Sequence, residues 1–402
     1  MHFQKYLEKH KVDFTLLRSQ EFHPDIIVVI PCYDEPELGK TIDSLVRAQS
    51  DGLCIEIIVV VNSGEFDSVK VIEQNRRTYV ELNDLSISNA FLISPILLEN
   101  VKYKHAGVGY ARKIGMDLAV ARYHNCKNKS GVIVSLDADT LVEQNYFQAI
   151  YSIFQENENA YGAIIRFEHH ISGESYSKDV FKAISAYELH LRYVNQAFKY
   201  ACFPYSHHTI GSAFAVRAWT YVKHGGMNRK KGGEDFYFLH KLFPHGEFVE
   251  VNSTCVYPSP RPSARVPFGT GPQVAEIMEQ DKFLTYSFKS FIDLRSFFQC
   301  VNQFYNSRPL FSECIESFLL EIDFDIKLEE IRANTSSFST FSKRFFTFFD
   351  AFKVLKFLNF ANIHYYSKGD IYVEAEKLLC AIDENDFDKS SLLDYFRKIE
   401  GK

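Results

Sequence analysis

Two acidic pairs, far apart in the sequence, have residue types suited to chemistry on a charged substrate. Asp137 and Asp139 end the apolar segment 131–139, whose first residues have the composition of a buried strand. Open α/β sheets bind ligands at the carboxyl ends of their strands, and carboxylate oxygens suit Mg²⁺ or Mn²⁺ held together with substrate phosphates. This position favours a metal site, whereas an Asp-x-Asp pattern alone also fits a turn that caps a helix.

The second pair, Glu234 and Asp235, follows Gly232 and Gly233 and precedes the apolar-periodic stretch YFLHKLF. Glycines let a backbone approach a ligand closely. A carboxylate here would supply a general base from a part of the chain distant from Asp137. The alternative is an acidic first turn of a helix, which the helix dipole stabilises.

Further polar groups are predicted at the same edge of the sheet. The segment PCYDE at 31–35 ends a first apolar run, and Asn62 begins the turn after a second. Arg112 and Lys113 lie near the start of a helix, where backbone N–H groups and the dipole favour anions. Each group alone also fits an ordinary turn or a solvated face. Three strands that end in polar residues on one edge together predict a pocket.

The elements that must position these residues alternate along the chain. We predict strands at 25–31, 55–62, 131–137 and 161–167, with helices at 37–49, 107–123 and 176–200. This order predicts an α/β domain with a mostly parallel sheet flanked by helices. From about 275 the alternation stops, and helices are predicted at 310–332, 341–363, 370–380 and 390–398. We therefore expect an N-terminal helical extension at 1–23, an α/β domain at 24–272 and a C-terminal helical domain at 273–402.

Composition excludes several classes of protein. The 402 residues are 46% hydrophobic and 24% charged, as in folded globular domains. With 45 basic and 51 acidic residues the net charge is −6, so no overall positive field attracts nucleic acid. The eight cysteines form no Cys-x-x-Cys pair, which argues against structural zinc or a dense disulfide framework. We find no secretory signal and no apolar run of ~20 residues, and expect a cytoplasmic chain with reduced thiols.

Taken together and in order, the motifs resemble those of family 2 glycosyltransferases of the GT-A fold, over roughly residues 24–270. The matching segments are Pro31-Cys32-Tyr33-Asp34-Glu35, Asn62-Ser63-Gly64, Ala111-Arg112-Lys113-Ile114-Gly115, Asp137-Ala138-Asp139, the strand from Gly211 to Arg217, and Glu234-Asp235. The resemblance divides the 24–272 domain into a nucleotide half at 24–140 and an acceptor half at 141–272. It implies inverting, metal-dependent transfer of a sugar from a nucleotide-diphospho-sugar donor, with Mn²⁺ or Mg²⁺ on the diphosphate.

The resemblance also implies roles for individual residues. The nucleoside pocket would be lined by Tyr33, Glu35 and Asn62, next to Pro31. Arg112 would lie near base and phosphate. Asp137 would contact ribose or sugar, Asp139 would bind the metal, Asp235 would be the catalytic base, and Glu234 would lie beside it on acceptor or sugar.

The sequence departs from the family pattern at three places. Asn62 stands where the family has an Asp that recognises uracil, which leaves the donor base open, and Lys113 replaces an Asn. A late histidine of the family is missing, and Arg261 or Arg265 on the following Pro-rich loop would neutralise the leaving diphosphate instead. The alternative for these arginines is ordinary loop surface.

The Phe-rich segment 344–360 is predicted to be buried in a helical domain, and the alternative is a peripheral contact with a membrane or a lipid-linked acceptor. The sequence thus predicts a glycosyltransferase at the cytoplasmic side, acting on a saccharide or lipid-linked saccharide in surface polysaccharide or glycolipid assembly. A nucleotidyltransferase, and a non-catalytic carbohydrate- or partner-binding module on the same fold, remain the alternatives.

Overall fold

The computed structural model describes residues 2–18, 21–85, 91–263, 265, 269–280, 282–382 and 392–401. Its contacts divide the chain into two units. The first comprises Met1–Phe181 and Thr209–Ala275, and the second comprises Lys182–His208 and Glu276–Lys402. The second unit therefore includes a segment that the sequence placed with the α/β domain, and the predicted domain limits stay a prediction.

The first unit is built on an eight-stranded sheet with the order β3-β2-β1-β4-β7-β6-β8-β5. Strands β1, β2, β3 and β4 are parallel neighbours, β6 is parallel to β8, and β7 and β5 run antiparallel to the strands they pair with. The strands are β1 (Ile26–Cys32), β2 (Ile55–Gly64), β3 (Phe91–Val101), β4 (Val132–Ser135), β5 (Leu141–Val142), β6 (Gly162–Phe167), β7 (Phe214–Arg217) and β8 (Phe248–Tyr257).

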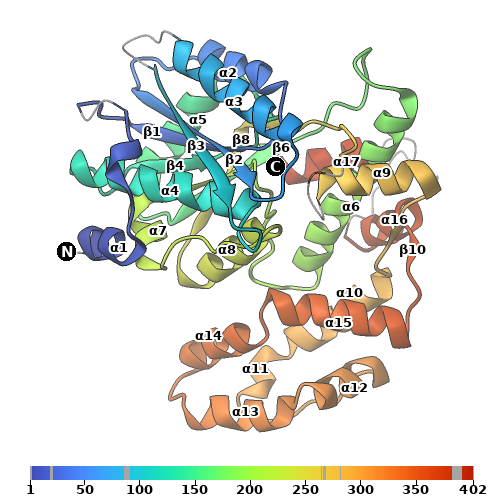
Figure 1. Ribbon diagram of the computed structural model, residues 1–402. Coiled ribbons are helices and arrows are strands. Elements are labelled where there is room, and N and C mark those ends of the chain that lie inside the picture. The colour runs from blue at the N-terminus through green and yellow to red at the C-terminus, as the bar shows by residue number, and fades with distance from the viewer. Residues whose placement is uncertain are drawn as a thin grey trace. The chain divides into compact units, whose positions relative to one another are not determined.

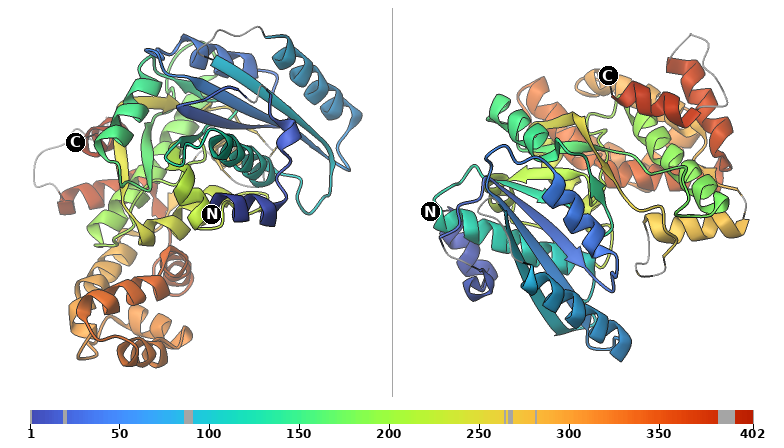
Figure 2. Two further views of the ribbon diagram at one scale, coloured as in Figure 1. Left: turned by 90° about the vertical axis from the view of Figure 1, so that its left-hand side faces the viewer. Right: turned by 90° about the horizontal axis from the view of Figure 1, so that it is seen from above.

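Helices cover both faces of this sheet (Figure 1 and Figure 2). The longest helix in the first unit, α4, packs against β1 and β2 and also contacts α1 and α7. Helix α3 packs on β2 and β3, and α5 packs on β8. The helices are α1 (His2–His10), α2 (Leu38–Arg47), α3 (Val69–Asp84), α4 (Val108–Asn125), α5 (Tyr146–Glu156), α7 (Ala218–Lys223) and α8 (Glu234–Leu242), with short 3₁₀ turns at Phe14–Leu16 and Phe243–His245. The predicted fold class, a mostly parallel sheet flanked by helices, is confirmed.

The central strands are buried because helices cover both their faces. Every residue of β1 and β2 is buried, which explains their continuous β-branched composition. Gly115 lets α4 approach the sheet, since a Cβ at this position would lie 2.4 Å from Cγ1 of Val29. The parallel arrangement of β1, β2 and β4 brings their three carboxyl ends to one edge.

The strands differ from the sequence prediction in several details: β5 and β8 were not predicted, and β2 continues through Asn62 to Gly64 instead of ending in a turn at Asn62. Strand β1 does not stop at Pro31, because Pro31 and Cys32 continue in register with Val60 and Val61. Strand β3 was not predicted, and its Pro95 is tolerated because β3 is an edge strand with a free side.

The second unit is helical, as predicted for the C-terminal region. Apart from the two-stranded pair β9 (Leu284–Thr285) and β10 (Gly369–Asp370), it contains α10 (Phe288–Gln299), α11 (Val301–Phe304), α12 (Glu313–Glu321), α13 (Phe324–Ala333), α14 (Phe338–Phe348), α15 (Ala351–His364), α16 (Ile371–Ile382) and α17 (Leu392–Glu400), and most of α6 (Lys178–Tyr200). Helix α9 (Thr270–Gln280) spans the limit between the units.

The two long helices predicted at 310–332 and 341–363 are each two shorter helices. The first is interrupted at Asp323, whose φ of 51° is left-handed and cannot continue an α-helix. The second predicted helix is interrupted between Phe348, where α14 ends, and Ala351, where α15 begins. The side chain of Asp350 caps α15 by accepting a hydrogen bond from Lys353 N at 3.0 Å. Among the described residues, no helix is long and apolar enough to cross a membrane, and all eight cysteines are unpaired.

Phenylalanines form the core of the second unit, which agrees in part with the predicted inward packing of the Phe-rich segment. Phe345 and Phe349 are fully buried, whereas Phe348 and Phe352 are partly exposed. Phe297 lies at the centre, with ring centroids of Phe304 at 5.2 Å and Phe349 at 4.8 Å. These rings fill the interior of this unit.

Replacing Phe297 by Ala should therefore lower the free energy of unfolding of the second unit by about 3–5 kcal/mol, because it removes a fully buried ring and leaves a cavity. Phe338, which is 41% exposed, is the matched control, and Phe338→Ala should change stability far less. Urea denaturation of both variants measures the difference. Equal losses would show that Phe297 is not the centre of this core.

Candidate active site

A buried guanidinium group joins the two acidic pairs identified in the sequence. Arg112, on α4, donates from Nε to Oε1 of Glu234 at 3.0 Å and from Nη2 to Oδ1 of Asp137 at 2.8 Å. Its Nη1 donates to the Ser135 hydroxyl at 2.5 Å and to the Gly211 carbonyl at 3.0 Å. Arg112 is only 2% exposed, so these partners account for its placement. Burial alone would lower the pKa of Arg112, and the carboxylates of Asp137 and Glu234 outweigh it and raise this pKa.

Close backbone approach explains why the segment of Glu234 reaches α4. A Cβ at Gly109 would lie 2.2 Å from the carbonyl oxygen of Lys230 and 2.9 Å from Cβ of Glu234. Gly233 precedes α8 with a φ of 66°, a left-handed conformation that favours glycine. Glycines thus let the loop before α8 lie across the start of α4, and they place Glu234 on Arg112.

Asp235, the predicted base, opens α8 and is partly buried. Its Oδ1 accepts a hydrogen bond from Phe236 N at 2.8 Å. Burial and the neighbouring Glu234 raise the pKa of Asp235, and Arg112 opposes this effect. A raised pKa brings the group closer to that of an efficient base.

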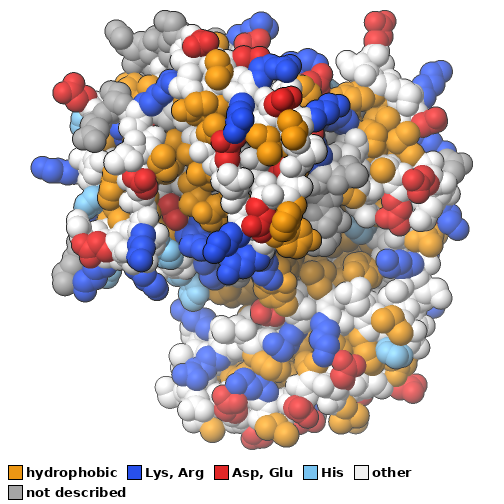
Figure 3. Space-filling view, in the orientation of Figure 1, with side chains coloured by type: hydrophobic (Ala, Val, Ile, Leu, Met, Phe, Trp, Pro, Cys, Tyr) orange, Lys and Arg blue, Asp and Glu red, His pale blue; other side chains and the backbone are white. Residues whose placement is uncertain are grey.

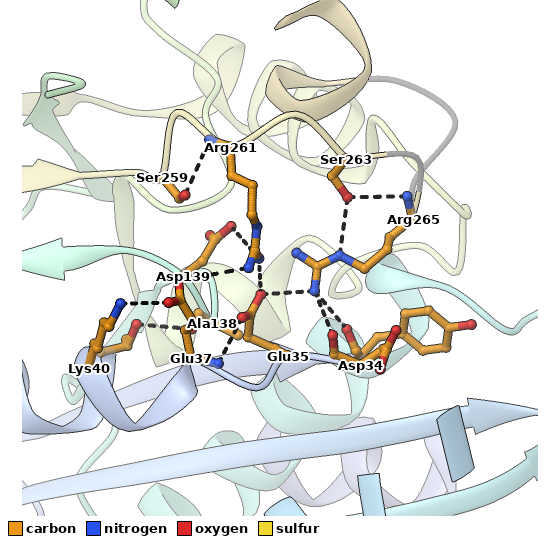
Figure 4. Close-up of polar contacts among 12 residues, drawn as sticks. Asp34, Glu35, Glu37, Lys40, Ala138, Asp139, Ser259, Arg261, Ser263 and Arg265 are labelled. Carbon is orange, nitrogen blue, oxygen red and sulfur yellow. Dashed lines mark hydrogen bonds and ion pairs between the residues drawn. The ribbon is translucent and has the colours of Figure 1, made fainter. Parts of the chain in front are cut away.

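At the same edge of the sheet, two arginines bind the carboxylate of Glu35 (Figure 4). Glu35 is 3% exposed, and its Oε2 accepts hydrogen bonds from Nη2 of Arg261 and, at 2.8 Å, from Nη1 of Arg265. Burial would raise the pKa of Glu35, but the hydrogen bonds and charge of Arg261 and Arg265 give a net lowering. Arg265 also donates to the carbonyl oxygen of Asp34 at 2.8 Å, which anchors the loop after β8 to the turn after β1.

Asp139 lies beside this pair of arginines. Nη2 of Arg261 is 3.8 Å from Oδ2 of Asp139, whose side chain is 31% exposed. Burial, followed by the negative charges of Asp137 and Glu35, raises the pKa of Asp139 to about 7, and Arg261 and Arg265 act in the opposite direction. A cation bound at Asp139 would favour its ionised form against this burial and the two neighbouring carboxylates.

A residue that was not predicted from the sequence joins the turn after β1 to the carboxyl end of β2. Asn75, on α3, is 1% exposed; its Oδ1 accepts from Asp34 N and its Nδ2 donates to the Asn62 carbonyl, both at 2.9 Å. Tyr33 donates to Oδ1 of Asp67 at 3.1 Å. Nothing in the sequence around Asn75 marks it, because a polar residue in an amphipathic helix normally faces solvent.

The structure therefore brings the predicted residues to one edge of the sheet in two neighbouring groups of ion pairs. Arg112 pairs with Glu234 and Asp137, and Arg261 and Arg265 pair with Glu35, with Arg261 also 3.8 Å from Asp139. Tyr33 lies on the turn after β1, Asn62 lies near the carboxyl end of β2, and Pro31 is buried within β1. The individual roles of these residues stay predictions.

Lys113, next to Arg112, lies outside these two groups of ion pairs. Its Nζ is 2.8 Å from Oδ2 of Asp117, and Asp117 accepts hydrogen bonds from Tyr6 at 2.7 Å and Tyr221 at 2.9 Å. Lys113 is buried, so it helps to hold α1 and α7 on α4. The Asn expected from the family pattern is replaced here by a lysine with a structural role.

Comparison with solved structures finds glycosyltransferases at low similarity. TarS of S. aureus, residues 1–349, is 13% identical, with 71% of this chain and 75% of that chain covered and a TM-score of 0.35. The complex of the same protein with UDP-GlcNAc is 14% identical, with 71% and 76% covered and a TM-score of 0.38. GalNAc-T7, crystallised with UDP, GalNAc and Mn²⁺, is 16% identical, with 80% of this chain and 56% of that chain covered and a TM-score of 0.37. No curated protein matches the chain.

The family comparison is more direct. The model of glycosyl transferase family 2 matches residues 27–217, which contain the turns after β1 and β2, the Arg112 helix and the Asp137–Asp139 pair. The match agrees with the GT-A fold predicted from the sequence, and it ends before Glu234 and Asp235. Residues 27–217 of this chain, slightly less than half of it, therefore resemble glycosyl transferase family 2.

Proposed function

We propose that the protein is an inverting glycosyltransferase that moves a sugar from a nucleotide-diphospho-sugar donor to a hydroxyl group of a saccharide or lipid-linked saccharide acceptor. Such an activity belongs to the assembly of surface polysaccharide or glycolipid. The family match supports a glycosyltransferase. The observation that carries the proposal is that Arg112 joins Glu234, the first residue of α8, to Asp137, which follows β4.

This placement supports a single displacement. The acceptor oxygen bonds to the anomeric carbon while the bond from that carbon to the diphosphate oxygen breaks, and the nucleoside diphosphate leaves. The acceptor proton passes to Asp235, which lies next to Glu234 and on a segment distinct from Asp137 and Asp139. Arg112 acts as a positioning residue because its donors are taken up by protein groups. Arg261 and Arg265 supply positive charge for the leaving diphosphate.

A divalent ion fits the donor set of this edge. Asp139 offers a partly exposed carboxylate beside Asp137 and Glu35, an oxygen-only set that suits Mg²⁺ or Mn²⁺. Within the described ranges, no group of three or more His, Cys, Asp or Glu side chains is arranged to hold a metal ion. One or two carboxylates with donor phosphates are a common arrangement for Mg²⁺, so Asp139 is the residue that would hold the ion. Bound there, the ion would neutralise charge on the diphosphate.

Thermal stability in the presence of nucleotide-sugars tests donor binding. A panel of UDP-, GDP- and dTDP-sugars, each with Mn²⁺ or Mg²⁺, should contain at least one donor that raises the melting temperature. At a hundredfold excess over its Kd, such a donor should add about 2.7 kcal/mol to the free energy of unfolding. If no member of a broad panel stabilises the protein and none is hydrolysed, the proposed function is wrong.

Asp139→Asn should abolish the metal-dependent part of this stabilisation, because the amide loses the charge that would hold the ion. Asp43, exposed on α2, is the matched control, and Asp43→Asn should retain the full shift. Melting curves with and without EDTA measure the metal-dependent part for each variant. A donor shift in wild type that EDTA does not change, or one that survives in Asp139→Asn, would contradict the role of Asp139.

A further inference from the structure

Two loops of the first unit gather five cations on one surface next to the candidate active site. Lys102 and Lys104 follow β3, and Arg229, Lys230 and Lys231 precede α8. We call these five residues the basic loop surface. Lys and Arg side chains form a dense cluster over the region of α8 (Figure 3). This concentration contrasts with the net charge of −6 for the whole chain.

The cations of this surface are not neutralised within the protein. Among the residues that the structure describes, none of the five has a carboxylate oxygen within 4.0 Å of its charged nitrogens. The carboxylate of Glu65 reaches this loop, but it accepts a hydrogen bond from the backbone N–H of Tyr103 at 2.7 Å. Partial burial, followed by the charges of Lys104, Arg229 and Lys102 from both loops, lowers the pKa of His105.

Aromatic rings lie among these cations and hold two of them. Nζ of Lys231 is 3.3 Å from the ring centroid of Tyr103, and Nζ of Lys230 is 3.1 Å from that of Tyr237. Tyr103 is 64% exposed and lies 6.0 Å from the ring of Phe66, which is 78% exposed. Exposed rings next to positioned cations can contact both the apolar faces and the charged groups of a saccharide.

The basic loop surface is continuous with the segment of the predicted base. Lys231 is separated from Glu234 by only two glycines. The backbone of the same loop lies against the start of α4, where a Cβ at Gly107 would be 3.0 Å from Cα of Lys231. An acceptor held on this surface would therefore lie beside the segment that carries Asp235. A membrane surface would not need this proximity, so the placement favours an acceptor.

We infer that the basic loop surface binds the anionic part of the acceptor, and that the acceptor is a saccharide carrying phosphate groups. This inference rests on the proposed glycosyltransferase function and specifies its acceptor class. Phosphates along such a chain would be contacted by several cations at once, so binding should weaken as salt rises.

Binding of medium-chain inorganic polyphosphate to the full-length protein tests the inference. Wild type should bind, and Lys230→Gln/Lys231→Gln should weaken binding about tenfold at low salt, with a shallower dependence on salt. The matched control is Lys127→Gln/Lys129→Gln. These lysines are exposed and follow the other end of α4, a helix of 18 residues and thus ~27 Å long. The control should bind within twofold of wild type.

Binding of polyphosphate is compared with binding of neutral dextran and of vesicles containing phosphatidylglycerol. Dextran should bind far more weakly than polyphosphate, and the vesicles should not bind through Lys230 and Lys231. Tight, lysine-dependent vesicle binding would assign the surface to a membrane and overturn the inference, as would equal losses in the test and control variants. Donor hydrolysis by wild type separately tests the proposed function, so failure of the acceptor inference can be told apart from failure of that function.

Discussion

Replacing Asp235 by Asn is expected to lower kcat for sugar transfer by ~10²–10⁴ while leaving donor affinity nearly unchanged. The amide has the size of the carboxyl and can still accept the hydrogen bond that Oδ1 receives from Phe236 N, but it cannot take a proton. Melting temperature and the donor-dependent shift should therefore remain close to those of wild type. Transfer within a few-fold of wild type would show that Asp235 is not the base, and Glu234 would be the next candidate.

The same assignment predicts a pH dependence. Burial and Glu234 raise the pKa of Asp235, so the protonated, inactive form persists to higher pH than for an ordinary aspartate. The rate should fall as pH decreases through this raised pKa, well above the ~3.9 of a free Asp side chain. A pH profile of kcat/KM for wild type measures the acid limb, which reports the free enzyme. An acid limb at the ordinary aspartate value would exclude Asp235.

Replacing Arg112 by Met should lower the free energy of unfolding by about 3–5 kcal/mol. The change removes a charge that is 2% exposed and leaves Glu234, whose side chain is 3% exposed, without its cation. Activity should also fall, because Glu234 and Asp137 lose the group that holds them together. Urea denaturation measures the loss of stability. Donor hydrolysis, at a temperature where the variant is still folded, measures the loss of activity.

Arg122 provides a matched control on the same helix. It is equally buried and pairs with Glu56 at 2.7 Å, away from the two acidic pairs. Arg122→Met should cost a similar amount of stability and leave donor hydrolysis of the folded protein intact. In addition, Glu234→Gln should cost less stability in the Arg112→Met background than alone. In that background the substitution removes a buried Glu234 carboxylate that no longer has its arginine partner. Retained activity in Arg112→Met, or equal activity losses in the two arginine variants, would contradict the positioning role.

The sequence predicts the central parallel strands β1, β2 and β4 well because local pattern determines them, whereas β3, β5 and β8 were missed. The buried parallel strands are continuous β-branched runs, and the residues at their ends are brought to one edge by the parallel arrangement itself. This is why Asp137, Tyr33 and Asn62 could be placed together without a structure. Strand β3 was missed because it is an edge strand containing Pro95, and the pair of helices at 341–363 was merged because the capping role of Asp350 is visible only in its hydrogen bond.

Long-range contacts explain what the sequence could not predict at the site. Arg112 and Glu234 are 122 positions apart, and no local pattern shows that they share a hydrogen bond. Likewise, Glu35 was expected at a nucleoside, whereas the structure shows its carboxylate on Arg261 and Arg265, 226 and 230 positions away. Such pairings depend on how the loops after β8 and before α8 return to the sheet edge.

The configuration of the sugar first released by donor hydrolysis tests the central claim most directly. In this slow side reaction water takes the place of the acceptor, so no acceptor needs to be known. Proton NMR at early times, before mutarotation, identifies the anomer. From an α-linked nucleotide-sugar that stabilises the protein, the account predicts the β anomer first, and at a rate at least about a hundredfold lower in Asp235→Asn. Initial release of the α anomer, or an unchanged rate in that variant, would contradict a single displacement assisted by Asp235.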